Sequence, residues 1–238
     1  MGTRTEVGLL RRAGVVSRWP VGMALASWRY LWRTTPLYRE DRCVSEISVP
    51  PLPVGVDDEG VQLPGAGVGP LFHRSYRTEL CEARMDAVEL VTRIARDPNW
   101  ASPAEVASFR KTRGRTGAME VGDEYLIRMP GPWDGPVRVI RRDTTSFRFA
   151  TLTGHLEAGQ IEFRAGHHAS HVTFEIESWA RSSDALSAFL YDRLHVAKEM
   201  QLSMWTHFLG RVARGAGARM TGGIHVLTER SQDVHDGR

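Results

Sequence analysis

The chain has 238 residues, of which 42% are hydrophobic and 25% charged, a composition that excludes disorder over the whole length. Its length suits one large domain, or one domain with an appendage. The formal net charge is only +3, so the overall charge gives no reason to expect a nucleic-acid partner. No segment approaches the ~18 uninterrupted apolar residues that a membrane-spanning helix needs.

The two cysteines, Cys43 and Cys81, have neither the number nor the spacing of a disulfide framework or a zinc site. We therefore expect free thiols in a reducing compartment. Arg18 and Pro20 interrupt the apolar run near the N-terminus, so this run does not have the unbroken core of a signal peptide. Together these features predict a cytoplasmic protein.

Positive charge is concentrated at the N-terminus, where the first 35 residues hold six arginines and one glutamate. Residues 20–34 carry apolar side chains at helical spacing, which predicts one amphipathic helix that ends before Pro36. We assign residues 1–48 to a basic N-terminal helical arm. Trp28 and Trp32 of this arm either pack on the main domain or bind an anionic membrane surface together with the arginines around them.

Residues 49–70 are rich in proline and glycine and show little periodicity, which predicts a linker before a main domain at 71–214. Two helices are expected early in this domain, one over 84–96 and a second that begins at Ser102. Period-two alternation between turn residues predicts strands over residues 72–80, 119–129, 136–142, 146–153, 159–165 and 171–180.

The strongest single pattern is a long helix over residues 184–214, followed by a polar, glycine-rich segment over 215–238 that we expect to be a flexible tail. One face of the helix is formed by Leu186, Leu190, Leu194, Ala197, Gln201, Met204, Trp205, Phe208 and Val212. A strand, two short helices, a run of antiparallel strands and one long C-terminal helix is the element order of an α+β helix-grip fold. We therefore expect a curved antiparallel sheet wrapped around the final helix.

One stretch in the middle of the domain resembles a known family. The shared pattern consists of Phe147, Phe149, Thr151, Leu152, Gly154, His155, Gly159 and Phe163. It resembles the family called domain of unknown function 1990, over residues 70–214 or so. That family commonly has an acid after the second glycine, where this chain has Gln160, so a role that needs a carboxylate there is in doubt.

The family is similar to the START-like and polyketide-cyclase-like helix-grip superfamily. This resemblance implies a pocket for an apolar or amphipathic small molecule, and it implies no particular reaction, because the fold hosts carriers, sensors and enzymes. It implies no cofactor.

Strand alternation decides which side chains face the final helix. It places Phe174, Ile176 and Ser178 on the inner face, and Glu175 and Glu177 on the outer, solvent side. Such an apolar wall either lines a pocket or is packed solid. If it lines a pocket, the residues that we expect to contact the ligand are Tyr125, Phe149, Thr151, Phe163, Gln201, Met204 and Trp205.

His155 is the weak candidate for a catalytic residue, since imidazole can act as a base near neutral pH. Its place after Gly154 in a hairpin turn equally suits a structural role. The histidines of residues 167–171 lie in a connection without a nearby Cys or Asp, so we expect no metal site. The sequence has no Walker loop, nucleophile elbow or dinucleotide fingerprint, and it gives no indication of oligomeric state.

Three functions remain open at this point. The first is a non-catalytic module that binds a hydrophobic or amphipathic small molecule between the sheet and the C-terminal helix. The second is a cyclase-like or hydrolase-like enzyme on the same fold. The third is a membrane-peripheral or interaction protein that acts through the N-terminal arm, and nucleic-acid binding is not expected.

Overall fold

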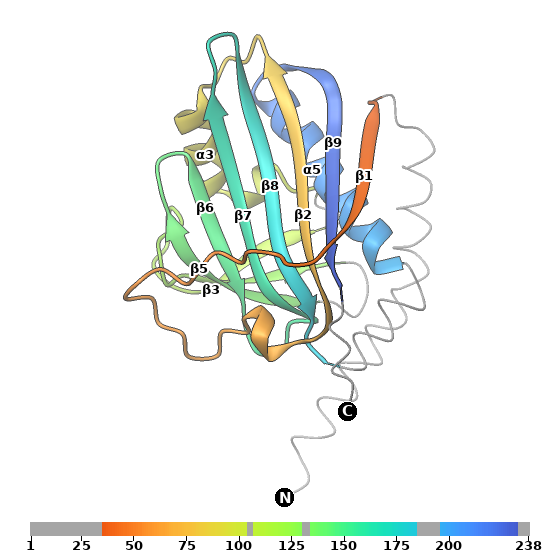
Figure 1. Cartoon of the computed structure of the whole chain (residues 1–238). Helices are drawn as coiled ribbons and strands as arrows, with labels where there is room; N and C mark the ends of the chain where they lie inside the picture. The colour runs from red at the N-terminus through yellow and green to blue at the C-terminus, as the bar shows by residue number, and fades with distance from the viewer. Residues whose placement is uncertain (1–34, 104–106, 130–133, 185–195, 233–238) are drawn as a thin grey trace, which may run out of the picture.

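The computed structural model describes residues 35–103, 107–129, 134–184 and 196–232, and within them a nine-stranded sheet curves around one long helix (Figure 1). The strand order is β1-β9-β2-β8-β7-β6-β5-β4-β3. This architecture confirms the predicted α+β helix-grip class. The strands are β1 Leu37–Val44, β2 Val68–Cys81, β3 Ser108–Arg113, β4 Glu124–Arg128, β5 Gly135–Arg142, β6 Ser146–Thr151, β7 Glu157–His167, β8 His171–Ser182 and β9 Arg219–Ser231. The helices are α3 Ala87–Arg96 and α5 Val196–Gly215, with 3-10 turns η1 Pro64–Ala66 and η2 Pro98–Trp100.

The strands from β3 to β8 form an antiparallel meander, and β2 extends it by pairing with β8. Each of the six predicted strands is present, although β4 starts at Glu124, later than predicted. The strand β3 was not predicted, because half of its sequence SFRKTR is basic and only Phe109 is buried in it.

The helix α3 has the amphipathic face that its sequence predicts. Asp86 caps its N-terminus by accepting from the backbone of Glu89, and the Glu89 side chain accepts from the backbone of Asp86 in return. A 3-10 turn, η2, begins at Pro98, before the predicted start of the second helix at Ser102, and residues 104–106 of that predicted helix lie outside the described part of the chain. Asp97 caps this turn instead, and the hydroxyl of Ser102 donates to the carbonyl of Ala107.

The core lies between α5 and the inner, concave face of the sheet. Large α5 side chains, including Trp205, Phe208 and Val212, pack on the aromatic side chains of β6, β7 and β8. The alternation predicted from the sequence is confirmed for Tyr125, Ile127, Val137, Val139, Phe147, Phe149, Phe163, Phe174 and Ile176. Of the predicted helix over 184–214, residues 185–195 lie outside the described part of the chain.

The predicted flexible tail is wrong for residues 219–231, which form β9 and pair with β2 along its length. The predicted helical arm is also wrong for its last residues, which form β1, an edge strand parallel to β9. Gly222 and Gly223 interrupt the alternating pattern of β9, so the sequence did not predict this strand. In β1, four successive charged residues leave no apolar alternation from which a strand could be predicted. The predicted helix over 20–34, with Trp28 and Trp32, lies outside the described residues.

The segment predicted to be a linker packs against the sheet. Residues 45–63, which we call the strap, cross the outer face of β9, β2, β8 and β7 (Figure 1). The side chain of Gln160 donates to the carbonyl of Pro50 (2.8 Å), and Arg138 donates to the carbonyls of Asp57 (2.8 Å) and Glu59 (2.9 Å). The strap is therefore part of the folded domain.

Candidate ligand-binding site

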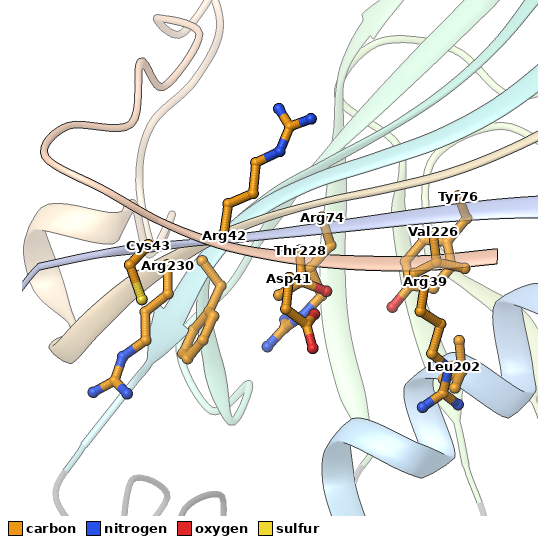
Figure 2. A pocket seen from close by; sticks show the side chains of 11 residues that line it. Arg39, Asp41, Arg42, Cys43, Arg74, Tyr76, Leu202, Val226, Thr228 and Arg230 are labelled. Atoms are coloured by element: carbon orange, nitrogen blue, oxygen red, sulfur yellow. The ribbon is translucent and has the colours of Figure 1, made fainter.

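A cavity of ≈ 300 Å³ lies against the inner face of β1, β9 and β2, beside the helix α5 (Figure 2). The residues that line it are Arg39, Asp41, Arg42, Cys43, Phe72, Arg74, Tyr76, Leu202, Val226, Thr228 and Arg230. Three strands supply all of them except Leu202, which comes from α5. The lining thus joins segments from both ends of the chain.

Strand register explains why these residues meet. In each strand every second residue faces the same side, so paired residues form rows across the sheet. The first row holds Arg39, Val226 and Tyr76; the second, Asp41, Thr228 and Arg74; the third, Cys43, Arg230 and Phe72. Each of the three rows therefore contributes one arginine to the same face.

The cavity is apolar on one side and charged on the other. Tyr76, Val226 and Leu202 are buried and form the apolar side. Arg42 differs from the other arginines, because Figure 2 shows its side chain pointing away from the rest of the lining. It pairs with Glu40 at 2.7 Å and approaches Glu229 to 3.9 Å.

Arg74 connects the cavity to the interior. Its side chain is only 5% exposed, its guanidinium lies 4.5 Å from the centre of the Phe72 ring, and one nitrogen donates to Oε1 of Gln201 (3.1 Å). Gln201 in turn donates to Glu157 (3.3 Å), whose other oxygen lies 3.9 Å from Arg74. Gln201, a predicted ligand contact, therefore positions Arg74 beside the cavity.

Two buried polar atoms next to this cluster have no hydrogen-bond partner in the described part of the chain: Oγ of Ser178 and Nε1 of Trp205. Ser178 pairs with Arg74 across β8 and β2, and Trp205 lies one helical turn after Gln201. Buried polar atoms without a partner are uncommon, because each has lost its hydrogen bonds to water.

The other predicted contacts lie deeper in the core and do not line this cavity. Tyr125, Phe149, Phe163 and Met204 are buried in the cluster between sheet and helix. Tyr125 and Phe149 pack edge to face at 5.8 Å, and Phe163 and Trp205 do so at 5.4 Å.

Thr151, another predicted contact, is hydrogen-bonded to the backbone. Its hydroxyl donates to the carbonyl of Gln62 (2.9 Å) and accepts from the amide of Gly159 (3.0 Å). The side chain thereby fixes the strap to β6 and β7.

His155 packs in the turn after β6. Its Nδ1 accepts from the backbone amide of Glu157 (2.9 Å), which leaves the proton on Nε2. Burial lowers the pKa of His155, so the ring is neutral near pH 7. The ring fills the space beside Gly135, where an added Cβ would lie 2.6 Å from Nε2. This arrangement anchors the turn.

Comparison with known proteins gives one family match. The model of the family described as domain of unknown function (DUF1990) matches residues 71–211, which is more than half of the chain. The chain belongs to the DUF1990 family. No curated protein matches it.

Several solved structures are similar to this DUF1990 protein. Ara h 8.0201 shares 13% identity at a TM-score of 0.42, over 60% of this chain and 99% of the other. The major latex-like protein 151 of Panax ginseng shares 14% identity at 0.41, over 57% and 99%. A protein from Arthrobacter aurescens shares 15% identity at 0.42, over 61% and 86%.

Most of the cavity lining lies outside the DUF1990 match. Only Phe72, Arg74, Tyr76 and Leu202 fall within residues 71–211, and the remaining lining residues come from β1 and β9. Sequence reasoning missed them because residues 37–44 were assigned to a helical arm and residues 219–231 to a flexible tail. The alternation of Ile224, His225 and Val226 in β9 ends at Leu227, and β1 has four successive charged residues, so neither strand had a clear local signal.

The outer face of the DUF1990 domain carries a second polar cluster, centred on His73. Nδ1 of His73 lies 2.8 Å from Glu229 on β9, and Nε2 lies 2.8 Å from Glu177 on β8. The ring stacks on Trp179 at 5.4 Å. The hydrogen bond to Glu177 raises the pKa of His73, and with the contribution of Glu229 it outweighs the opposing effect of burial. Both ring nitrogens are engaged, so the cluster links three strands.

The described residues offer neither a metal site nor a membrane-spanning helix. They contain no group of three or more His, Cys, Asp and Glu side chains arranged to hold a metal ion. None of the helices among them has both the length and the hydrophobicity to cross a membrane.

Proposed function

We propose that this DUF1990 protein binds an amphipathic small molecule in the cavity between the β1-β9-β2 face and α5. One observation supports the proposal: a ≈ 300 Å³ cavity has an apolar side and a side with arginines. Ligand pockets of proteins start at about this volume and combine apolar walls with a few polar groups. The apolar part of the ligand packs on Tyr76, Val226 and Leu202.

The hydrogen bond and the position of His155 favour binding over catalysis. Its Nδ1 is engaged by the amide of Glu157, and the residue does not line the cavity. A general base must reach its substrate within hydrogen-bond distance. Both cysteines are free, which supports our proposal of a reducing, cytoplasmic location.

The interior extends the proposed site. A ligand that reaches past Arg74 meets Ser178 Oγ and Trp205 Nε1, the two polar atoms without a partner among the described residues. Trp205 packs on Phe163 in the core, behind the residues that line the cavity. Ligand binding then supplies the hydrogen bonds that these atoms lack.

The proposal is tested by a substitution that fills the cavity, made at the half-buried residue Thr228. Thr228→Trp places an indole in the middle row, whereas Thr221→Trp puts the same indole at an exposed position of the same strand. We expect the neutral fluorophore N-phenyl-naphthylamine to bind the wild type and Thr221→Trp equally. Thr228→Trp should bind it at least about tenfold more weakly, because the indole takes its place.

Native mass spectrometry of the purified wild type should in addition show a small molecule bound at one per chain. Equal affinity of the fluorophore for Thr228→Trp and the wild type, with both variants folded by circular dichroism, would place the binding site elsewhere. The proposal would then be wrong for this cavity.

A further inference from the structure

We infer that His73, on the outer face of β2, is a positioning residue for the cavity on the opposite face, and that the ligand binds more tightly when the His73 ring is an imidazolium. The inference rests on the proposed function, since it concerns the regulation of the same cavity. It uses the contacts of His73, the register of the strands and the places of the neighbouring residues in the chain.

The contacts of His73 depend on the charge of its ring. Nδ1 lies 2.8 Å from an oxygen of Glu229 on β9, and Nε2 lies 2.8 Å from an oxygen of Glu177 on β8. Only imidazolium donates from both nitrogens, because a neutral ring has one N–H and one lone pair. In the neutral form one of the two carboxylates faces that lone pair and is repelled. The proton therefore decides whether this side chain links β2 to both neighbouring strands or to one.

The charged groups around His73 come from four strands. Arg42 of β1 approaches Glu229 to 3.9 Å, and Arg164 of β7 pairs with Glu177 at 3.1 Å. In the described part of the chain the strap adds no ion pair to His73 or to these two carboxylates. The hydrogen bond to Glu177, together with the contribution of Glu229, outweighs burial and raises the pKa of His73. The imidazolium is therefore the form present at mildly acidic pH.

The His73 cluster lies directly behind the cavity. Arg42 and His73 are both register partners of Glu229, so the three residues form one row across β1, β9 and β2. Chain neighbours of an outward-facing strand residue face inward. Both neighbours of each of these residues line the cavity: Asp41 and Cys43, Thr228 and Arg230, Phe72 and Arg74. Figure 2 shows Arg42 pointing away from this lining.

The link from His73 to Glu229 therefore acts on the strands that form the cavity. Among the described strands β1 pairs only with β9, so the part of the lining that β1 supplies follows the position of β9. When the imidazolium holds β9 to β2, the lining is preorganised, and ligand binding costs less ordering entropy. When the ring is neutral this link is lost, and the ligand must order the lining itself.

Fluorescence titration with N-phenyl-naphthylamine at two pH values tests the inference. The probe stays uncharged over this range, so a change in its affinity belongs to the protein. We expect the wild type to bind it at least about threefold more tightly near pH 6 than near pH 9, because the stabilising proton is lost as the pH rises through the raised pKa of His73. Saturation with the probe should in turn lower the acid dissociation constant of His73, followed by NMR, by the same factor.

Two variants remove the proton-dependent link in different ways. His73→Gln has no titrating ring and should bind the probe about equally near pH 6 and near pH 9. Glu229→Gln keeps the ring but replaces a carboxylate by an amide, which donates to a neutral ring or accepts from a charged one, so its affinity should also change little with pH. His225→Gln, at an exposed histidine of β9, is the matched control and should keep the wild-type difference. All of these proteins retain Cys43, the thiol of the lining, so comparison with His73→Gln isolates the effect of the imidazole.

The outcomes separate this inference from the proposed function. Equal affinity of the wild type near both pH values, or an undiminished pH dependence in His73→Gln, overturns the inference, while the proposed function stands because the probe still binds. If the probe does not bind the wild type at either pH, the proposed function is overturned and the inference with it. Circular dichroism checks the fold of each variant at both pH values, and Glu229→Gln decides if His73→Gln does not fold.

Discussion

His73 shows how a single residue can connect three strands. It lies on β2 between Glu177 of β8 and Glu229 of β9, and its side chain is 15% exposed. Around it, Trp179 stacks on the ring, Arg164 pairs with Glu177 (3.1 Å), and Arg42 approaches Glu229. The imidazolium therefore has carboxylates on both sides and no cation in direct contact.

These contacts predict a pH dependence of stability. The pKa of His73 is raised in the folded state, so its stabilising effect is fully present below the unfolded pKa of about 6.5 and is lost as the pH rises through the folded pKa. Burial alone would raise the pKa of Glu177, but hydrogen bonds from His73 and Arg164 lower it overall. The contribution of Glu177 is therefore lost at acidic pH, as the pH falls through its folded pKa.

We expect His73→Gln to lower the free energy of unfolding by about 1–2 kcal/mol near pH 6, and by clearly less near pH 9. Urea denaturation at both pH values measures the difference. His225→Gln changes an exposed histidine on the same face, whose ring stacks on Tyr38, and it should show no such pH-dependent difference. A constant gap between wild type and His73→Gln would contradict the proposed charge on His73.

At the scale of elements, β9 depends on a bulge. The pairing of β9 with β2 shifts between Thr78 and Glu79, opposite Gly222 and Gly223. Both glycines have positive φ, +72° and +77°, a conformation that other residues adopt at a cost. The hydroxyl of Thr78 donates to the carbonyl of Gly223 (2.9 Å), which fixes the bulge to β2.

The two glycines should respond differently to alanine. A Cβ at Gly223 would lie 2.5 Å from the carbonyl oxygen of Pro36, whereas one at Gly222 would meet only the His225 ring at 3.8 Å. We expect Gly222→Ala to cost about 1–2 kcal/mol from the backbone alone. Gly223→Ala should cost at least about 1 kcal/mol more, because the start of β1 must move.

Urea denaturation of the two variants provides the comparison, and ligand binding provides a second readout. Gly223→Ala should also weaken binding of N-phenyl-naphthylamine, since β1 and β9 form the cavity. Equal stability of the two variants would show that β1 tolerates the displacement.

At the scale of the whole molecule, the strap covers a buried polar layer on the outer face. Arg148 pairs with Glu162 beneath it, with side chains 8% and 6% exposed, and Trp179 is buried beside them. The alternation predicted an outer face open to solvent for Glu175 and Glu177, yet both are half-buried and paired with Arg164. The strap, which precedes the predicted domain in the sequence, thus covers the outer face, and the sheet lies between the strap and α5.

Arg138 holds the far end of the strap, so Arg138→Met should loosen it. The variant loses the hydrogen bonds to the carbonyls of Asp57 and Glu59 and the pairing with Glu124 (2.7 Å). We expect a glutamate-specific protease to cut after Glu59 at least about threefold faster than in the wild type, through local opening. Arg141→Met, at an exposed arginine of the same strand, should leave the rate unchanged. Equal rates for both variants would show that other contacts hold the strap.

The sequence by itself determined the local elements and the fold class. The long C-terminal helix, α3 with its cap and the alternation of β6, β7 and β8 follow from interactions between residues close in the chain. It also placed Gln201 and Trp205 on the face of α5 that points inward. These features need no knowledge of distant partners.

Only the tertiary structure decided that residues 37–44 and 219–231 form strands of the sheet. The rows that form the cavity combine Arg39, Tyr76 and Val226, and no local pattern specifies pairing over such separations. Alternation tells which side a residue faces within its strand, but the neighbouring strand is chosen by burial of the whole sheet and by bulges such as Gly223. For this reason β1, β9, the strap and the arginines of the cavity could not be assigned until the strands were paired.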